Sequence, residues 1–250
     1  KLLDANEPTF DGQRVHTPPE LKTALKAFAD AGLMAAGQAF ERGGMQLPHL
    51  IEKACFVWFS AANISASGYP LLTIGNANLM LAHAAPDLVE RYVPPMLEGR
   101  WFGTMCLSEP QAGSSLSDVR TRAEPQADGS YRVFGNKMWI SGGEQDLTEN
   151  IVHLVLAKIP GPDGKLPAGV KGISLFVVPK VLVNDDGSLG ERNDVVLAGL
   201  NHKMGNRGTT NTLLNFGEGK FRPGGAAGAK GWLVGELNQG LACMFHMMNE

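Results

Sequence analysis

The first hundred residues place apolar side chains at helical spacing. After Thr17-Pro18-Pro19, the clearest set recurs at positions i, i+3, i+4 and i+7: Leu21, Ala24, Leu25 and Phe28. Threonine as a cap, proline in the first turn and glycine after the end are typical of helix boundaries. The spacing therefore predicts a helix with one buried face that runs to Gly32.

Three further helical stretches follow. One begins at Pro48 and gathers four side chains on one stripe: Ile51, Ala54, Cys55 and Trp58. The next, from about Pro70 to His83, is apolar around most of its circumference, which is typical of a helix inside a bundle. The last begins near Pro86 and is expected to end or kink at Pro94-Pro95, because proline lacks the backbone N–H and clashes with the preceding turn.

From Trp101 the pattern changes to short runs rich in β-branched and aromatic residues, separated by turn residues. The predicted strands are residues 102–107, 119–123, 131–140, 151–157, 170–178 and 212–216. Asp128-Gly129 is the clearest hairpin turn. Residues 160–169 and 184–193 are predicted to form longer exposed loops. The glycine-rich segment 217–231 offers little apolar area to offset its ordering entropy, which predicts a mobile linker.

The order of these elements predicts an α+β fold that ends in a new apolar helix from Gly240. The predicted parts are an N-terminal helical bundle over residues 1–100, a middle all-β, barrel-like domain over residues 101–230, and the beginning of a C-terminal helical domain over residues 231–250. The chain starts at Lys1, and its last helix stops after a few turns at Glu250. We therefore expect the first domain to be incomplete at its start and the last domain to be truncated.

Composition and charge narrow the function classes. A hydrophobic content of 44% over 250 residues is enough to bury a substantial core. A net charge of −3 without a basic run argues against nucleic acid as a partner. No apolar run is long enough to span a bilayer, and three widely spaced cysteines without a CxxC argue against disulfides and a metal site. We expect a soluble, cytoplasmic protein without a metal.

Two segments carry candidate chemistry, Met105–Ser114 (MCLSEPQAGS) and Lys137–Ser141 (KMWIS). Taken alone, Ser108-Glu109-Pro110 is explained as well by a turn that ends a strand, and a lone tryptophan is more often a core residue than a cofactor platform. Both segments in this order, joined by a hairpin, resemble the flavin-binding signature of acyl-CoA dehydrogenases.

The resemblance covers nearly the whole chain. Further matching pieces are Gly43-Gly44, His202-Lys203-Met204-Gly205 and Gly235-Glu236. Residues 172–180 and 187–193 most resemble the large branch of the family that contains 3-methylmercaptopropionyl-CoA dehydrogenase.

The resemblance implies FAD as the cofactor and assigns it eight positions: Met105, Leu107, Ser108, Gly113, Ser114, Trp139, Ile140 and Ser141. In relatives, residues matching Met105 and Leu107 give apolar contacts and backbone donors to the pyrimidine edge of the flavin, and the Ser108 position adds a hydroxyl. Trp139 would pack against the ring, with the Ser141 hydroxyl near N5.

Three positions are implied to contact the substrate. Ser114 matches a family position near the cofactor pyrophosphate and the CoA arm, whereas Met248 and Asn249 align with positions near the pantetheine. The implied reaction is α,β-dehydrogenation of an acyl-CoA thioester with hydride transfer to flavin N5, and electrons would pass on to an electron-transfer flavoprotein.

No catalytic base is assigned. In most of the family the catalytic Glu lies in the C-terminal helical domain, and in a minority it lies at the position immediately after Glu250. An offset of one residue on a helix rotates a side chain by about 100°. The base is therefore expected beyond Glu250, and Glu109 is interpreted as structural. We expect the segment alone to bind FAD weakly and to be inactive.

Alternatives stay open at this point. The resemblance implies a homodimer or homotetramer for a full-length chain. The same fold could carry different flavin chemistry, of the nitroalkane oxidase or flavin monooxygenase type, or the chain could be a non-catalytic truncated binding protein. Five histidines show no ligand spacing, and each of them is interpreted as a surface or satisfied core residue: His49, His83, His153, His202 and His246.

Overall fold

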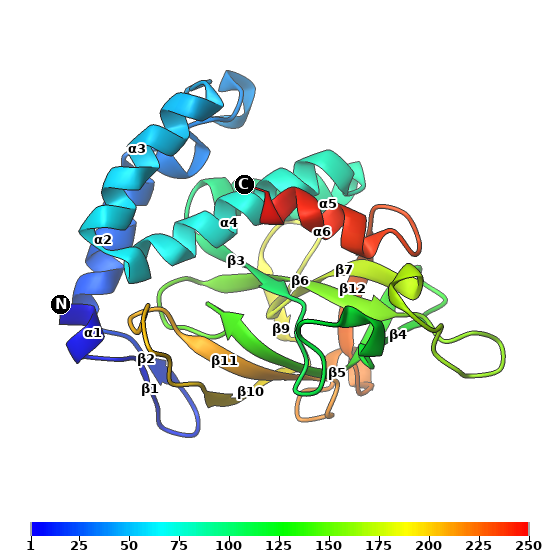
Figure 1. The fold of residues 1–250 in the computed structure, drawn as a ribbon. Coiled ribbons are helices and arrows are strands. Elements are labelled where there is room, and N and C mark those ends of the chain that lie inside the picture. Colours follow the sequence, from blue (N-terminus) through cyan, green and yellow to red (C-terminus); the bar gives the residue numbers. More distant parts are fainter. Residues whose placement is uncertain (1, 250) are drawn as a thin grey trace.

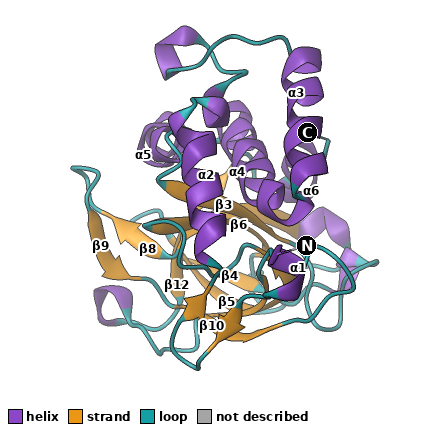
Figure 2. Cartoon of the chain, turned by 90° about the vertical axis from the view of Figure 1, so that its left-hand side faces the viewer, coloured by secondary structure: helices purple, strands orange, loops and turns teal. Residues whose placement is uncertain are grey.

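The structure, a computed structural model, describes residues 2–249 and combines helices with one large sheet (Figure 1). The α-helices are α1 Leu2–Ala5, α2 Pro19–Asp30, α3 His49–Ala62, α4 Ile64–His83, α5 Pro86–Leu97 and α6 Gly240–Met248. The strands are β1 Thr9–Phe10, β2 Val15–His16, β3 Trp101–Cys106, β4 Arg122–Pro125, β5 Tyr131–Ser141, β6 Asn150–Lys158, β7 Ile173–Pro179, β8 Val181–Val183, β9 Leu189–Arg192, β10 Val195–Leu200, β11 Asn211–Phe216 and β12 Ala229–Val234. The longer helices gather on one side of the sheet (Figure 2).

Eight strands form a sheet in the order β10-β11-β5-β12-β7-β6-β3, and β4 pairs with both β5 and β6. Because β4 joins two strands that are not neighbours along this path, the sheet folds back on itself into a barrel-like shape. Its interior is filled from all eight strands: Cys106, Ala123, Val133, Ile140, Val155, Ala157, Phe176, Val178, Val195, Leu214, Phe216 and Ala229. The predicted α+β fold with a barrel-like middle part is confirmed.

Strand β6 shows how the barrel and the helices share one sheet. Every residue of β6 is buried. Val152, Leu154 and Leu156 belong to the cluster packed against α4, α5 and α6, whereas Val155 and Ala157 belong to the barrel interior. Because side chains alternate between the two faces of a strand, a strand covered on both faces has a continuous apolar sequence.

Close approaches fix two helices on the sheet. The Asn76 amide of α4 donates to the carbonyl oxygens of Thr104 in β3, at 3.3 Å, and Val152 in β6, at 2.9 Å. At the start of α6, a Cβ atom at Gly240 would lie 2.3 Å from the carbonyl carbon of Ser174 in β7. Only glycine permits that contact, so α6 is anchored on β7 at its first residue.

Helix α3 extends away from the sheet (Figure 1), and none of its residues is buried. Phe56 and Phe59 pack edge-on against Phe28 of α2. The stripe predicted for this helix includes Ile51 and Trp58, and both side chains are exposed, Trp58 by 78%. The helix is present as predicted, but its apolar stripe lies outside the core of the described residues.

Two helix predictions need correction. The third helix begins at Ile64 and not near Pro70, because the Asn63 side chain caps it by accepting the Ala66 N–H at 2.9 Å. The fourth helix, expected to end or kink at Pro94-Pro95, does not end there but continues to Leu97. Packing of the helix against α4 and β3 outweighs the backbone bonds that the two prolines cannot make.

The sequence pattern missed six strands: β1, β2, β8, β9, β10 and β12. The expected loop 184–193 contains β9, and the expected linker 217–231 ends inside β12, which lies between β5 and β7 in the sheet. The boundary predicted at residue 230 therefore falls within a strand.

The glycine-rich segment before β12 is organised by one carboxylate. Asp194 is fully buried. Its two oxygens accept the backbone N–H groups of Gly219 at 2.7 Å, Phe221 at 3.2 Å and Gly228 at 3.0 Å. Hydrogen bonds to a charged acceptor replace the apolar burial that the composition lacks.

Among residues 2–249, no helix has both the length and the apolar character needed to cross a membrane.

Candidate functional site

The first candidate segment begins where β3 ends. The chain leaves the strand at Leu107, and Glu109 and Ala112 close a tight turn: the Glu109 N–H donates to the Ala112 oxygen at 2.7 Å, and the Ala112 N–H donates to the Glu109 oxygen at 3.0 Å. Met105, Leu107 and Ser108 remain half-buried. The turn thus leaves a partly apolar edge accessible next to the barrel.

The second candidate segment contains a β-bulge. Thr212 of β11 pairs with Ile140 of β5 and Leu214 pairs with Lys137, so two residues of β5 oppose one residue of β11. One of these two is Trp139, whose φ of 64° lies in the left-handed region that L-residues with a side chain rarely adopt. The bulge turns its indole outward, 55% exposed. Trp139 is therefore not the core residue that a lone tryptophan usually is.

Direct hydrogen bonds hold the two segments together. The Met138 N–H donates to the Ser108 carbonyl oxygen at 2.9 Å. The Lys137 ammonium donates to the Leu107 carbonyl oxygen at 2.9 Å and to Glu109 Oε1 at 3.0 Å. The exit of β3 and the bulge of β5 therefore form one continuous wall.

The Glu109 carboxylate is almost completely buried and fully engaged. It accepts from Lys137, from the N–H and hydroxyl of Thr121, from the Arg120 N–H and from the Gln111 amide, at 2.5 to 3.0 Å. Burial alone would raise the pKa of Glu109, but the Lys137 ammonium and these donors lower it to about 2. The geometry supports the structural role expected for Glu109.

The three predicted hydroxyls differ in exposure. Ser108 and Ser141 are half-buried on the wall, and Ser114 is exposed. A Cβ atom at Gly113 would meet only Ser108 Oγ, at 3.9 Å, so the approach to this side of the wall is open. Ile140 points the other way: its side chain is buried in the barrel interior, and its carbonyl oxygen accepts the Thr212 hydroxyl. Only its backbone borders the wall.

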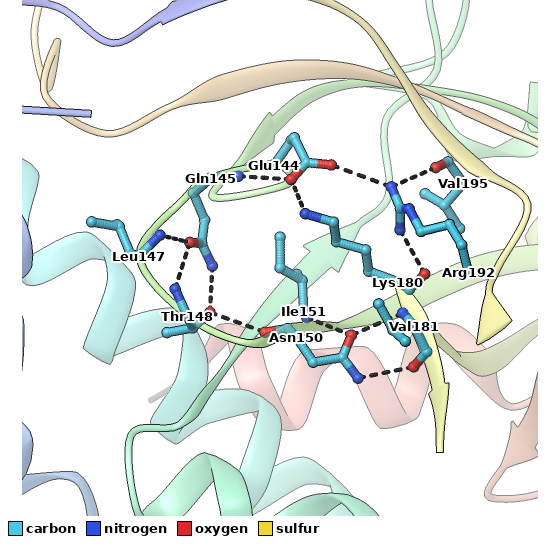
Figure 3. A network of polar contacts seen from close by, with 10 residues as sticks. All are labelled: Glu144, Gln145, Leu147, Thr148, Asn150, Ile151, Lys180, Val181, Arg192 and Val195. Atoms are coloured by element: carbon cyan, nitrogen blue, oxygen red, sulfur yellow. Dashed lines mark hydrogen bonds and ion pairs between the residues drawn. The ribbon is translucent and has the colours of Figure 1, made fainter. Parts of the chain in front are cut away.

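The loop after Ser141 is held by charges that the sequence pattern did not reveal. Glu144 forms ion pairs with Lys180, at the end of β7, and with Arg192, at the end of β9. The Arg192 guanidinium also donates to the carbonyl oxygens of Lys180 at 2.6 Å and Val195 at 3.0 Å. Burial lowers the pKa of Arg192, and the Glu144 carboxylate opposes that shift. Figure 3 shows these three charged side chains converging from different segments.

Asn150 completes this support at the start of β6. Its side-chain oxygen accepts the N–H groups of Val181 and Ile151, both at 2.9 Å. Its side-chain amide donates to the Val181 carbonyl oxygen at 2.9 Å (Figure 3). Gln145 caps the turn at Leu147 and Thr148 from within the loop. Both ends of the loop that follows the wall are therefore fixed. The three charged residues are spread along the chain, with Glu144 and Arg192 48 positions apart, and form no motif from which this cluster could be predicted.

A polar group lies inside the barrel behind the wall. His153 Nδ1 is 2.7 Å from Thr104 Oγ1 and 4.0 Å from Cys106 Sγ, and all three residues are fully buried. Burial raises the pKa of the Cys106 thiol to about 12, which excludes it as a thiolate nucleophile at neutral pH.

The predicted substrate residues at the end of the chain are not hydrogen-bonded to the wall. Met248, the last residue of α6, and Asn249, which follows it, are exposed, and within residues 2–249 no hydrogen bond joins either of them to the two segments. Helix α6 and the wall are neighbours through packing, because Met105 and Leu107 border the cluster that contains Cys243 and Met244. Glu250 lies outside the described residues.

The wall has the chemistry of a platform for a flat ring with polar edges: an exposed indole, apolar Met105 and Leu107, and flanking hydroxyls. These donors and faces suit an isoalloxazine. Within residues 2–249, no cluster of three or more His, Cys, Asp or Glu side chains could hold a metal ion.

Comparisons with known proteins place this wall inside a matched region. Residues 104–218 match a family model described as the acyl-CoA dehydrogenase middle domain. The 3-methylmercaptopropionyl-CoA dehydrogenase of Ruegeria pomeroyi is 40% identical over 245 residues, which is 98% of this chain and 39% of that protein. A butyryl-CoA dehydrogenase of Syntrophomonas wolfei is 38% identical over 248 residues, 96% of this chain and 38% of that protein.

Solved structures show the same fold. The crystal structure of an acyl-CoA dehydrogenase complexed with FAD from Bacillus anthracis matches with a TM-score of 0.70 at 23% identity, over 92% of this chain and 34% of that one. The chain spans about two fifths of the length of the curated relatives it matches.

Proposed function

The chain belongs to the acyl-CoA dehydrogenase family, and we propose that it forms one wall of an FAD site at which an acyl-CoA thioester is dehydrogenated between Cα and Cβ. The observation that carries the proposal is the junction of the two candidate segments, where Lys137 and Met138 bond Leu107 and Ser108 beneath an exposed Trp139. Bound FAD supplies the hydride acceptor, N5 of the flavin.

Each residue of the wall has a defined part in this proposal. Trp139 gives an aromatic face for the ring, and Met105 and Leu107 give apolar contacts at its edge. The hydroxyls of Ser108 and Ser141 can donate to polar ring atoms, each contributing about 1 kcal/mol. Donors fixed in advance stabilise developing negative charge without reorganisation.

Substrate and cofactor arms are proposed to extend away from the ring. Ser114, exposed after the tight turn, would bind near the pyrophosphate and the CoA arm. Met248 and Asn249 would border the pantetheine from α6. The two relatives act on different thioesters by name, so we propose the acyl-CoA class and not one acyl chain.

We propose that the base that removes the α-proton comes from the part of the relatives' length that this chain does not span. Glu109 cannot serve, because its oxygens are occupied and its pKa is lowered to about 2. The wall residues bind and orient, and proton removal is assigned elsewhere.

Two further parts of the proposal follow from family membership. Electrons would pass to an electron-transfer flavoprotein, and the protein would assemble as a homodimer or homotetramer. Cytoplasmic localisation agrees with the three free cysteines, Cys55, Cys106 and Cys243.

The cofactor part is tested by titrating the chain with FAD and following flavin fluorescence and absorbance. We expect saturable binding that is weakened in W139A. As a control, W58A changes an even more exposed tryptophan, 78% against 55% for Trp139, on α3 and outside the wall, and should leave the titration unchanged. Absence of saturable binding to the folded chain would overturn the proposal.

The dehydrogenation part is tested in a chimera in which this chain replaces the matched region of the Ruegeria pomeroyi relative. We expect anaerobic addition of an acyl-CoA to bleach the bound flavin. A folded chimera that binds FAD but is bleached by no acyl-CoA, while the parent enzyme is bleached, would contradict dehydrogenation by this wall.

A further inference from the structure

The contact between Lys137 and the Leu107 carbonyl does more than join two segments. Lys137 is fully buried, and its ammonium lies 2.9 Å from the Leu107 oxygen and 3.0 Å from Glu109 Oε1. Burial lowers the pKa of Lys137, and the Glu109 carboxylate opposes that shift. A buried ammonium is thus kept beside a backbone carbonyl of the wall.

The pair is oriented relative to the wall. The Glu109 end of the pair is bonded to the backbone of Arg120 and Thr121, before β4, whereas the Lys137 end touches the peptide that leaves β3. The positive end of the buried pair therefore lies against the backbone of the wall at Leu107, and the negative end is tied to the backbone that leads into β4.

The carbonyl of Leu107 and the N–H of Ser108 belong to one trans peptide, so they point in opposite directions. A cation on the carbonyl polarises the peptide and makes the N–H at its other end a stronger donor. Within residues 2–249, no hydrogen bond occupies the Ser108 N–H, whereas the Ser108 carbonyl is fixed by the Met138 N–H. The peptide is thus both polarised and held in place.

We propose that Lys137 is a positioning residue that, through the Leu107–Ser108 peptide, makes the wall favour reduced over oxidised flavin. The inference rests on the proposed FAD site. It assigns a function to the lysine of the second segment, which otherwise only bridges two strands. The charge carries the effect, since a neutral donor would hold the carbonyl without polarising it to the same extent.

The test measures the dissociation constants of the purified chain for oxidised FAD and for dithionite-reduced FAD under anaerobic conditions. The preference for reduced flavin is the dissociation constant for oxidised FAD divided by that for reduced FAD. We expect this ratio to fall about tenfold in K137M, as for the loss of one buried charge near the ring. K137Q keeps a donor for the Leu107 carbonyl but lacks the charge, so its ratio should fall to a similar extent.

Lys158 offers a matched control. It is also a buried lysine, and its ammonium donates to the carbonyl of Ser117 at 2.7 Å. K158M should lower thermal stability, as K137M does, but leave the preference for reduced flavin unchanged. A purely structural role for Lys137 would make the two variants alike.

E109Q is the second route if the Lys137 variants do not fold. Without the carboxylate, Lys137 loses its proton more easily, so the preference for reduced flavin should decline more steeply with rising pH in E109Q than in the parent chain. Unchanged ratios in folded K137M or K137Q, or the same pH dependence in E109Q and the parent chain, would overturn the inference while leaving FAD binding intact. A parent chain that binds neither form of FAD would overturn the proposed function itself.

Discussion

His153 Nδ1 lies 2.7 Å from Thr104 Oγ1 inside the barrel, and Nε2 on the other side of the same ring has no hydrogen-bond partner within residues 2–249. Burial lowers the pKa of His153 to about 3, with the Arg192 and Lys180 charges adding to the shift. The imidazole is therefore neutral at pH 7 in the fold and protonates readily only when the chain unfolds.

This geometry predicts loss of stability in mild acid. Between the unfolded pKa near 6.5 and the folded pKa near 3, the unfolded chain binds the extra proton, so the free energy of unfolding falls as the pH falls. The expected slope is about 1.4 kcal/mol per pH unit below 6.5. Urea unfolding at several pH values from neutral to 5 measures it.

H153F provides the comparison, because phenylalanine keeps an aromatic ring against Phe216 without a titrating group. Its unfolding free energy should lack the His153 contribution to this slope between pH 6.5 and 5, where Glu109 is mostly ionised in both states. Equal slopes for the parent chain and H153F would contradict the assignment.

Substitution of Trp139 should weaken FAD binding with little effect on the free energy of unfolding. Its left-handed backbone costs about 1–2 kcal/mol for a residue with a side chain, and glycine relieves that strain. Since the indole is 55% exposed, W139G should change the free energy of unfolding by less than about 1 kcal/mol in either direction. FAD affinity should fall about tenfold through loss of the aromatic face. A parallel loss of several kcal/mol in stability would show that the indole supports the fold.

The wall illustrates what the residues alone could predict. Both segments are identified from their residue sequences and their order along the chain, and the predicted family membership is confirmed. The bulge that exposes Trp139 was not predicted, because a positive φ at a non-glycine residue has no sequence signal. The pairing of Glu109 with Lys137 joins residues 28 positions apart and depends on how β3 and β5 meet.

For the glycine-rich segment, residues 217–231, the composition led to a wrong expectation. Its composition predicted a mobile linker, but the prediction could not account for Asp194, a single carboxylate 25 to 34 positions away that accepts three of its N–H groups. Local entropy favoured a linker, and long-range hydrogen bonding to a buried charge outweighed it. Strand β12 was missed for the same reason, since its pairing with β5 and β7 is non-local.

These bonds predict that Asp194 limits protease access to the glycine-rich segment. D194A leaves the N–H groups of Gly219, Phe221 and Gly228 without their acceptor, so the segment should open more often. Trypsin should then cleave after the exposed Lys220 at least about tenfold faster, as loss of hydrogen bonds to a charged group implies. Mass spectrometry of the digest identifies the cut. D186A, which removes an exposed aspartate of the β8–β9 turn, serves as the control and should leave this cleavage unchanged.

The carboxylates near the wall predict the behaviour of the chain toward substrate. Glu109 is bonded to both segments, but its pKa is lowered to about 2, so it cannot hold a proton taken from carbon at neutral pH. Glu144, three residues after Ser141, is held between Lys180 and Arg192. We therefore expect FAD-loaded chain to show no bleaching of flavin absorbance when an acyl-CoA is added anaerobically, although dithionite bleaches the same sample. Acyl-CoA-dependent bleaching would mean that a base lies within these residues, and its loss in E109Q or E144Q would then identify which carboxylate acts.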